Sequence, residues 1–570
     1  MRTMHNVLPQ AAYQNFLSDS DEANKVLKSK WDPTEFEKLR ALRKNAPVDI
    51  DEFRKQKAQR DMFAKALMKA RINMQKDVTS SGLTSSIGYN FYDLRGPAYL
   101  IYPVNTPFRN MLPREGRVNA GVGTAAHWKA TRNFGTVYAG VAEGQRNASV
   151  APDEIDYTSI YKELGIERAA TFTSQFAGEG YTDNLADEHL RGMHELFLQE
   201  ESLMLFGNPG SANSQGGFAL GTMNTPVAAL ATGTGITDAR YVSGYCVALT
   251  ALGYPTNAQF GYLERPTTDV GLTPSFTRTN ADGSQDTING GTSQISAVSN
   301  SVLTTGSTHW VTFTATPKTG AFGYAWYLAI KSADTMTLAD HHLVAITALP
   351  TYTLKADPTT LTQAANATGL DSDHSMQTLD FIGLFTYAAT QGRWVDMAGS
   401  SLTSDGANGI EEIDDDLAYF WDNFQAVPDN IWCAGDSKRF IDQTIMANGG
   451  NPGAFRFDYA RDSQNNILGG SVVSAYQSKY SMSALGGAAI PMRIHPMLPS
   501  GSIYYDIGTN PYPSSRLPFV RGMLVQRDYY SIEWPLQTRQ WTFGTYVHEV
   551  LAHNVPWITG VRCGIGGADT

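Results

Sequence analysis

Two histidines and a glutamate near the C-terminus have the residue types of a zinc protease site. The sequence has His548-Glu549 followed by His553, whereas zinc proteases use H-E-x-x-H, which puts both imidazoles on one helical face. Histidines five residues apart diverge by about 140 degrees on a helix, and on a strand they face opposite sides. We therefore predict no metal site at these residues.

Three other groups imitate catalytic or binding motifs. Gly121-Val122-Gly123 opens a strand instead of a helix, so we interpret it as a loop and not as a dinucleotide fingerprint. Asp340-His341-His342 with His309 could meet as a metal site, but polar turn residues explain them better. Asp414-Asp415-Asp416 is interpreted as the solvated face of a helix. Because G-x-S-x-G and phosphate-loop motifs are also missing, we predict no catalysis and no cofactor.

Length and composition restrict the class of protein. A chain of 570 residues is too long for one core and predicts two or three domains. Its three cysteines are far apart without C-x-x-C spacing, which disfavours a disulfide framework and a thiolate zinc site. Residues 1–17 do not read as a signal peptide, and no apolar run is long enough to span a membrane. Secretion and membrane insertion are therefore not expected.

The charge is unevenly distributed along the chain. The net charge is -11, yet residues 23–76 carry an excess of lysine and arginine on two helix-like segments. This excess is either a solvated helical face or a basic arm that faces nucleic acid or a partner. The candidate residues of such an arm are Lys55, Lys57, Arg60, Lys65, Lys69 and Arg71.

A strand-rich texture follows, and it leads into one long helix. The runs 126–132 and 158–168 read as two antiparallel strands that flank a polar tip rich in glycine. A hairpin of this kind cannot bury both faces unaided, so it needs a neighbouring body. The clearest helix is 184–206, with N-cap candidates at Thr182 and Asp183 and with Gly207 where a left-handed C-terminal residue belongs.

Five motifs in succession give the chain a family resemblance. They are T-P-F-R-N-M-L-P-R (106–114), Trp128-Lys129, A-E-G-Q (142–145), Y-T-S-I-Y-K-E-L-G (157–165) and E-E-S-L-M-L-F-G-N (200–208). In this order the chain resembles the major capsid proteins of tailed bacterial viruses with the Hong Kong 97 fold. The resemblance implies an N-terminal arm, an extended hairpin called the E-loop, a peripheral domain with a spine helix, and an axial domain.

The second half continues the resemblance around an insertion. A helix over 409–424, a strand over 430–433 and a helix from Asp436 alternate, and later strands are expected over 492–498, 502–506, 523–527, 531–534 and 540–551. Between the two halves, residues 226–357 alternate like an all-β sandwich of the immunoglobulin or fibronectin type. An inserted sandwich of this kind would project outward from a shell.

The predicted fold class is therefore α+β, a Hong Kong 97-like capsid fold with an inserted all-β sandwich. The predicted parts are a helical arm (1–85), the E-loop hairpin with the start of the peripheral domain (86–182), the spine helix (183–225), the sandwich (226–357), and the axial domain with returning C-terminal strands (358–570).

The resemblance implies a structural subunit that forms hexamers and pentamers of an icosahedral head around double-stranded DNA. Its expected partners are itself, a portal, and possible scaffold, protease or cement proteins, with assembly in the host bacterial cytoplasm. A shell protein of an encapsulin-like nanocompartment is the first alternative. A bacterial surface β-sandwich protein is another, which the lack of a signal-peptide pattern disfavours. The residues predicted to contact neighbouring subunits are Arg114, Trp128, Lys129, Phe134, Tyr138, Glu143 and Arg146.

Some shells of this family join subunits through lysine to asparagine isopeptide bonds. Lys129 and Lys162 lie in the predicted hairpin, but no motif fixes a partner asparagine. We interpret both as ordinary surface lysines.

Overall fold

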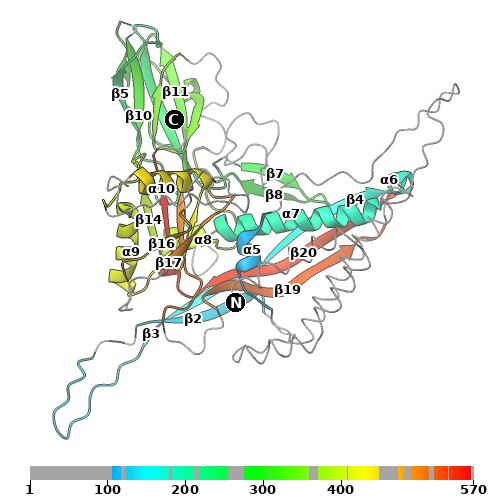
Figure 1. Cartoon of the computed structure of the whole chain (residues 1–570). Helices are drawn as coiled ribbons and strands as arrows, with labels where there is room; N and C mark the ends of the chain where they lie inside the picture. Colours follow the sequence, from blue (N-terminus) through cyan, green and yellow to red (C-terminus); the bar gives the residue numbers. More distant parts are fainter. Residues whose placement is uncertain are drawn as a thin grey trace, which may run out of the picture. The chain divides into compact units, whose positions relative to one another are not determined.

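The structure is a computed structural model, shown in Figure 1. It describes residues 105–116, 123–133, 135, 137–178, 183–210, 217–254, 275–306, 308–357, 370–406, 409–447, 473–480, 489–512, 519–536 and 538–566. The predicted basic arm (1–85) and Phe134 lie outside these residues. The described chain forms two compact units: one of Ile166–His194 and Ser531–Thr545, and one of the remaining described residues.

In the smaller unit, ring contacts hold two helices against a long strand. It contains α6 (Phe172–Gly178) and the first half of α7 (Asn184–Phe206). Phe172 meets Trp541 edge-to-face at 3.9 Å, and His189 stacks on Phe543 at 3.5 Å between ring centroids. These contacts fix the start of α7 on the strand that begins at Gln540.

Helix α7 has the bounds that the sequence predicted. The Asp183 carboxylate accepts a hydrogen bond from the backbone N–H of Ala186 at 3.4 Å, as an N-cap does. The expected left-handed residue at Gly207 was wrong, because Gly207 is absent from the described glycines with positive φ. Glycine is required there by close packing, since a Cβ atom would lie 2.3 Å from the carbonyl oxygen of Phe381.

A four-stranded sheet has the order β1-β19-β20-β4. The two strands predicted over 523–527 and 531–534 form one strand, β19, and the predicted strand 158–168 is two strands divided at Tyr161. The division occurs because the chain changes partner there, from the hairpin to this sheet. The bounds are β1 (Arg114–Gly116), β4 (Lys162–Thr171), β19 (Arg521–Glu533) and β20 (Gln540–His553).

A six-stranded sheet has the order β14-β21-β18-β15-β17-β16. Apolar side chains of this sheet and of helices α9 and α10 form one hydrophobic core. The strands are β14 (Arg393–Asp396), β15 (Asn430–Cys433), β16 (Ala475–Gln477), β17 (Ala489–Ile494), β18 (Ile503–Asp506) and β21 (Gly560–Cys563). The helices near it are α5 (Pro107–Met111), α8 (Leu384–Thr390), α9 (Glu411–Phe424) and α10 (Gly435–Ala447). Two short 3-10 helices are Leu338–Asp340 and Pro556–Ile558.

The acidic run on α9 is not a solvated face, so that interpretation was wrong. Asp414 and Asp416 are buried, and only Asp415 is exposed. Asp416 receives Arg562 at 2.7 Å and Arg393 at 2.7 Å. Asp416 points inward because the neighbouring strands β14 and β21 carry these arginines, whereas Asp414 accepts a hydrogen bond from the Tyr476 hydroxyl at 2.8 Å.

Residues 226–357 contain two antiparallel sheets that share one core (Figure 1). Val311 and Phe313 of one sheet pack with Tyr324 and Trp326 of the other. The sheets are β13-β10-β5 and β12-β11-β6-β9, formed by β5 (Val227–Thr232), β6 (Tyr241–Leu249), β9 (Val302–Leu303), β10 (His309–Thr314), β11 (Gly323–Lys331), β12 (His342–Thr347) and β13 (Thr351–Leu354).

Two expectations for this region change. Strands β7 (Ser275–Thr279) and β8 (Gln285–Asn289) pair only with each other and belong to neither sheet. His341 is fully buried and not an exposed turn residue, because its ring nitrogens bond the Ser243 hydroxyl and the Thr337 carbonyl, both at 2.8 Å. The α+β class is confirmed, and no helix among the described residues is long and apolar enough to cross a membrane.

Candidate subunit-contact surface

The predicted hairpin is present as β2 (Ala125–Asn133) and β3 (Asp153–Ile160), which pair antiparallel. Trp128 lies opposite Tyr157, with ring centroids 5.7 Å apart. The Trp128 indole N–H donates to the carbonyl oxygen of His553 at 3.4 Å. One face at the base of the hairpin therefore packs on its own subunit, and Trp128 is half-buried there.

The opposite face of the hairpin is charged and exposed. The Lys129 ammonium lies 3.1 Å from Asp156 and 4.0 Å from Glu154 on the facing strand. The hydrogen bond to Asp156 and the nearby carboxylates raise the pKa of Lys129. Exposed pairs of this kind add little to stability, so Lys129 remains available to an approaching surface.

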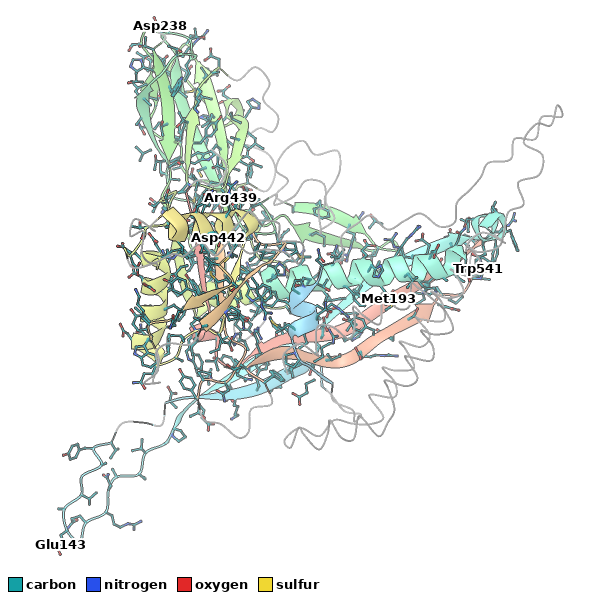
Figure 2. The ribbon with its side chains drawn as sticks, in the orientation of Figure 1. Glu143, Met193, Asp238, Arg439, Asp442 and Trp541 are labelled. Atoms are coloured by element: carbon teal, nitrogen blue, oxygen red, sulfur yellow. The ribbon has the colours of Figure 1, made fainter. Side chains whose placement is uncertain are left out.

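Beyond the paired strands, the tip has no regular structure, and all residues from 137 to 150 are exposed. Glycines with positive φ shape it: at Gly135 a Cβ atom would lie 2.1 Å from a Val150 methyl, and Gly144 lies in a turn closed by the Gln145 N–H. Glu143 lies at the far end of this tip (Figure 2). The tip is thus a long projection whose side chains contact little of their own chain.

Several apolar side chains of the tip face solvent. Tyr138 is 88% exposed, and Val137, Val141 and Val150 are between 40% and 46% exposed. Glu143 and Arg146 are the charged residues among residues 137–150. Apolar and aromatic side chains flanked by charges are typical of a surface that binds another protein.

Arg114, predicted as a charged subunit contact, is bound by acids of its own chain, and its side chain is 22% exposed. Its two terminal nitrogens bind Glu200 on α7 and Glu549 on β20, the latter at 2.6 Å. Arg109 joins from α5, with its Nε 3.0 Å from Glu200. Tyr529 on β19 donates its hydroxyl to Glu200. We call Arg109, Arg114, Glu200, Tyr529 and Glu549 the buried ion cluster.

Charge and burial act against each other in this cluster. Burial alone would raise the pKa of Glu200, but Arg114 and Arg109 lower it below its ordinary value. The neighbouring Glu201 carboxylate accepts the backbone N–H groups of Phe108 at 2.8 Å and Arg109 at 2.7 Å, and it contacts His495 at 2.8 Å. The acids of α7 therefore tie the segment before the hairpin to the subunit.

His548 and His553, the residues of the imitated zinc motif, have separate surroundings. His548 contacts the Tyr530 hydroxyl at 2.7 Å and Glu163 at 3.0 Å. His553 is fully buried, and burial lowers its pKa to about 3. In the part of the chain that the structure describes, no group of three His, Cys, Asp or Glu side chains could hold a metal ion.

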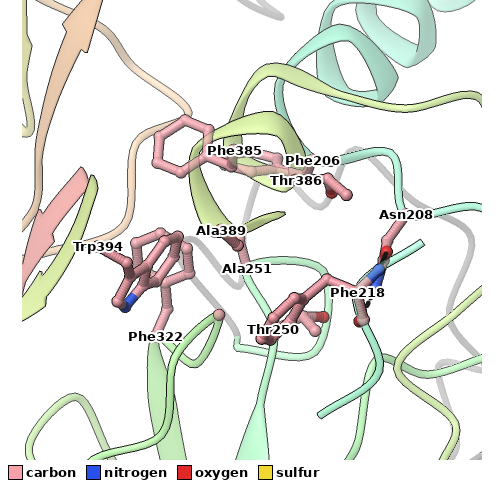
Figure 3. Close-up of a pocket in the computed structure, with 11 residues that line it drawn as sticks. Phe206, Asn208, Phe218, Thr250, Ala251, Phe322, Phe385, Thr386, Ala389 and Trp394 are labelled. Atoms are coloured by element: carbon pink, nitrogen blue, oxygen red, sulfur yellow. Dashed lines mark hydrogen bonds between the residues drawn. The ribbon is translucent and has the colours of Figure 1, made fainter. Parts of the chain in front are cut away.

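A small cavity lies where the ends of α7 and α8 meet the two-sheet region (Figure 3). Aromatic side chains dominate its lining, among them Phe206, Phe322, Phe385 and Trp394. It holds about 30 Å³, which suits one water molecule and no substrate.

The structure thus divides the predicted contact residues. Tyr138, Glu143 and Arg146 lie together on the exposed tip, Lys129 lies on the exposed face, Trp128 is shared with its own subunit, and Arg114 is internal. The sequence prediction did not include Val137, Val141 and Val150. Valines spaced among glycine, serine and charged residues were the signal that could have identified them.

Comparisons with known proteins show where the chain has likenesses. No protein-family model and no curated protein matches it. It is similar to the capsid of an empty GTA particle at 8% identity, covering 83% of this chain and 94% of the other with a TM-score of 0.32. It is likewise similar to a structure from Mycobacterium phage Adephagia at 7% identity, covering 87% and 99%, with a TM-score of 0.32.

An encapsulin also matches, over a shorter length. The holo-SrpI encapsulin complex from Synechococcus elongatus is 12% identical, with a TM-score of 0.19. The match covers 31% of this chain and only 55% of the encapsulin chain. The solved structures that are similar over more than four fifths of this chain include further capsids.

Proposed function

We propose that this protein is the major capsid protein of a tailed bacterial virus, a structural subunit that forms the hexamers and pentamers of an icosahedral head. The exposed hairpin tip carries this proposal, because it holds Tyr138 and three valines in water. A projection that buries so little of its apolar surface in its own chain gains stability when a second subunit covers it.

In the assembled head, the hairpin would lie across a neighbouring subunit. The base of the hairpin is fixed to its own subunit by Trp128, and the buried ion cluster anchors the segment that precedes it. A rigid base and an unsupported tip suit a contact in which the tip lies on an adjacent peripheral domain. Tyr138 would be the apolar anchor, with Glu143 and Arg146 setting the register.

The two-sheet region within residues 226–357 would be an accessory domain of the immunoglobulin type. It has its own core, and its first and last strands, β5 and β13, both flank β10 in one sheet. A region with a core of its own can fold as a separate domain within a larger subunit. We infer that it projects from the outer surface of the head.

The basic arm would face the packaged double-stranded DNA. Lys55, Lys57, Arg60, Lys65, Lys69 and Arg71 supply the charge for contacts with phosphates that do not depend on sequence. A portal, and scaffold, protease or cement proteins, would be further partners during assembly in the host bacterial cytoplasm.

Catalysis has no place in this proposal. The imitated zinc ligands lie in separate surroundings, with His553 buried and His548 bound to Tyr530 and Glu163.

Electron microscopy of the full chain expressed alone tests the proposal. Closed shells or ordered capsomers are the expected result, and a chain that stays monomeric at high concentration contradicts it. Shells isolated from an infected host should contain double-stranded DNA. A protein cargo in place of DNA would favour the nanocompartment alternative.

A further inference from the structure

The ion cluster contains two buried carboxyl groups that receive different numbers of hydrogen bonds. The Glu200 and Glu549 side chains are both fully buried. Glu200 receives Arg114, Arg109 and the hydroxyl of Tyr529. Glu549 receives Arg114 on Oε2 at 2.6 Å, and within the described residues no N–H or hydroxyl group reaches its Oε1.

An ionised carboxylate with a buried oxygen that accepts nothing is costly, because the oxygen has lost its water without replacement. The same oxygen is satisfied if it carries a proton, because a carboxylic acid donates one hydrogen bond. The Glu200 and Glu549 carboxyl groups lie beside each other, because the two terminal nitrogens of the Arg114 guanidinium bind one each, and the two side chains are in hydrogen-bonding contact. Glu200 is the natural acceptor, since two arginines hold it in the ionised form.

We propose that Glu200 and Glu549 share one proton, with Glu549 as the acid and Glu200 as the carboxylate, and that this proton holds α7 and β20 together at the base of the hairpin. The proposal concerns the folded subunit and stands whether or not the chain assembles into a shell.

The charges around the pair are consistent with one proton. Burial, followed by the negative charge of Glu200, raises the pKa of Glu549, and this outweighs the attraction of Arg114. Tyr529 stays neutral, because burial and Glu200 raise its pKa. The titratable and charged groups that face the pair or adjoin it are Arg109 on α5, Arg114 on β1, Glu201 on α7, His495 after β17, and Asp528 and Tyr529 on β19.

The direction of the pH dependence follows from the folded pKa of Glu549 being higher than the unfolded one. Such an acid contributes its full stability below the unfolded pKa of about 4.3. The contribution is then lost as the pH rises toward the folded pKa. The junction therefore holds best in mild acid and weakens as the solution becomes neutral and then alkaline.

Thermal unfolding of the full chain across about pH 5 to about pH 9 tests the proposal. Glu549→Gln keeps a neutral group that can donate a hydrogen bond to Glu200 at every pH. As the pH increases, the natural chain should therefore lose more thermal stability than this variant, and the difference between the two unfolding midpoints should shift in favour of the variant. Asp528→Asn is the matched control, because it removes a partly exposed carboxylate 3.7 Å from the same Arg114. The control should keep the pH profile of the natural chain.

A constant deficit of Glu549→Gln at every pH would overturn the proposal, because it would mean that Glu549 is ionised and simply binds Arg114. Infrared spectroscopy covers the case in which this variant does not fold. Asp380 is first replaced by Asn, since burial raises the pKa of Asp380 to about 7 and it would add its own acid band. At about pH 7 this chain should keep a carboxylic acid band, and its absence would equally reject the shared proton.

Discussion

The tip of the hairpin and the ion cluster near its base use similar charged side chains in opposite settings. Arg146 and Glu143 lie in water on the tip, whereas Arg114 and Glu200 are tied together inside the subunit. Charges on the tip can meet a neighbour at little cost, while charges in the cluster must be paired before the subunit can fold. Removing a cluster residue should therefore damage the subunit, and removing a tip residue should damage only the assembly.

The largest effect is expected from Arg114→Ala. This change leaves Glu200 and Glu549 buried without their shared partner, and breaking a buried pair in this way costs about 3–5 kcal/mol. Chemical denaturation should show a much lower free energy of unfolding, with assembly lost as a consequence. Near-natural stability of this variant would show that the cluster does not hold the subunit.

A smaller effect, confined to assembly, is expected from Tyr138→Ala. Tyr138 is 88% exposed, so the unfolding midpoint should stay where it is. If the ring is an anchor on a neighbour, its loss should cost about 2 kcal/mol per contact and raise the concentration needed for assembly roughly 30-fold. Light scattering against protein concentration measures this concentration. A loss of subunit stability as large as that of Arg114→Ala would contradict the distinction between the tip and the ion cluster.

The smallest effect is expected from Lys129→Ala. The ammonium is exposed, and its ion pairs among the described residues are with two acids on the facing strand, Asp156 and Glu154. Neither the unfolding midpoint nor the assembly concentration should change measurably in moderate salt. A clear assembly defect would instead make Lys129 part of the contact surface beside Tyr138.

Sequence patterns identified the elements better than the roles of single side chains. Helix α7 and the β2–β3 hairpin were predictable, because capping residues, apolar periodicity and glycine positions are local signals. The position of Arg114 was not predictable from the sequence, because Glu200 and Glu549 are far from it along the chain. Asp416 of α9 was misread for the same reason, since its partners Arg393 and Arg562 arrive from other strands.

The most direct test of the account replaces the apolar side chains of the tip together. A chain with serine at Val137, Tyr138, Val141 and Val150 should keep the unfolding midpoint of the natural protein, because these residues face solvent. Sedimentation should show shells or capsomers for the natural chain and only single subunits for the variant. Shells formed equally well by both chains would contradict the claim that the hairpin tip is the surface through which subunits assemble.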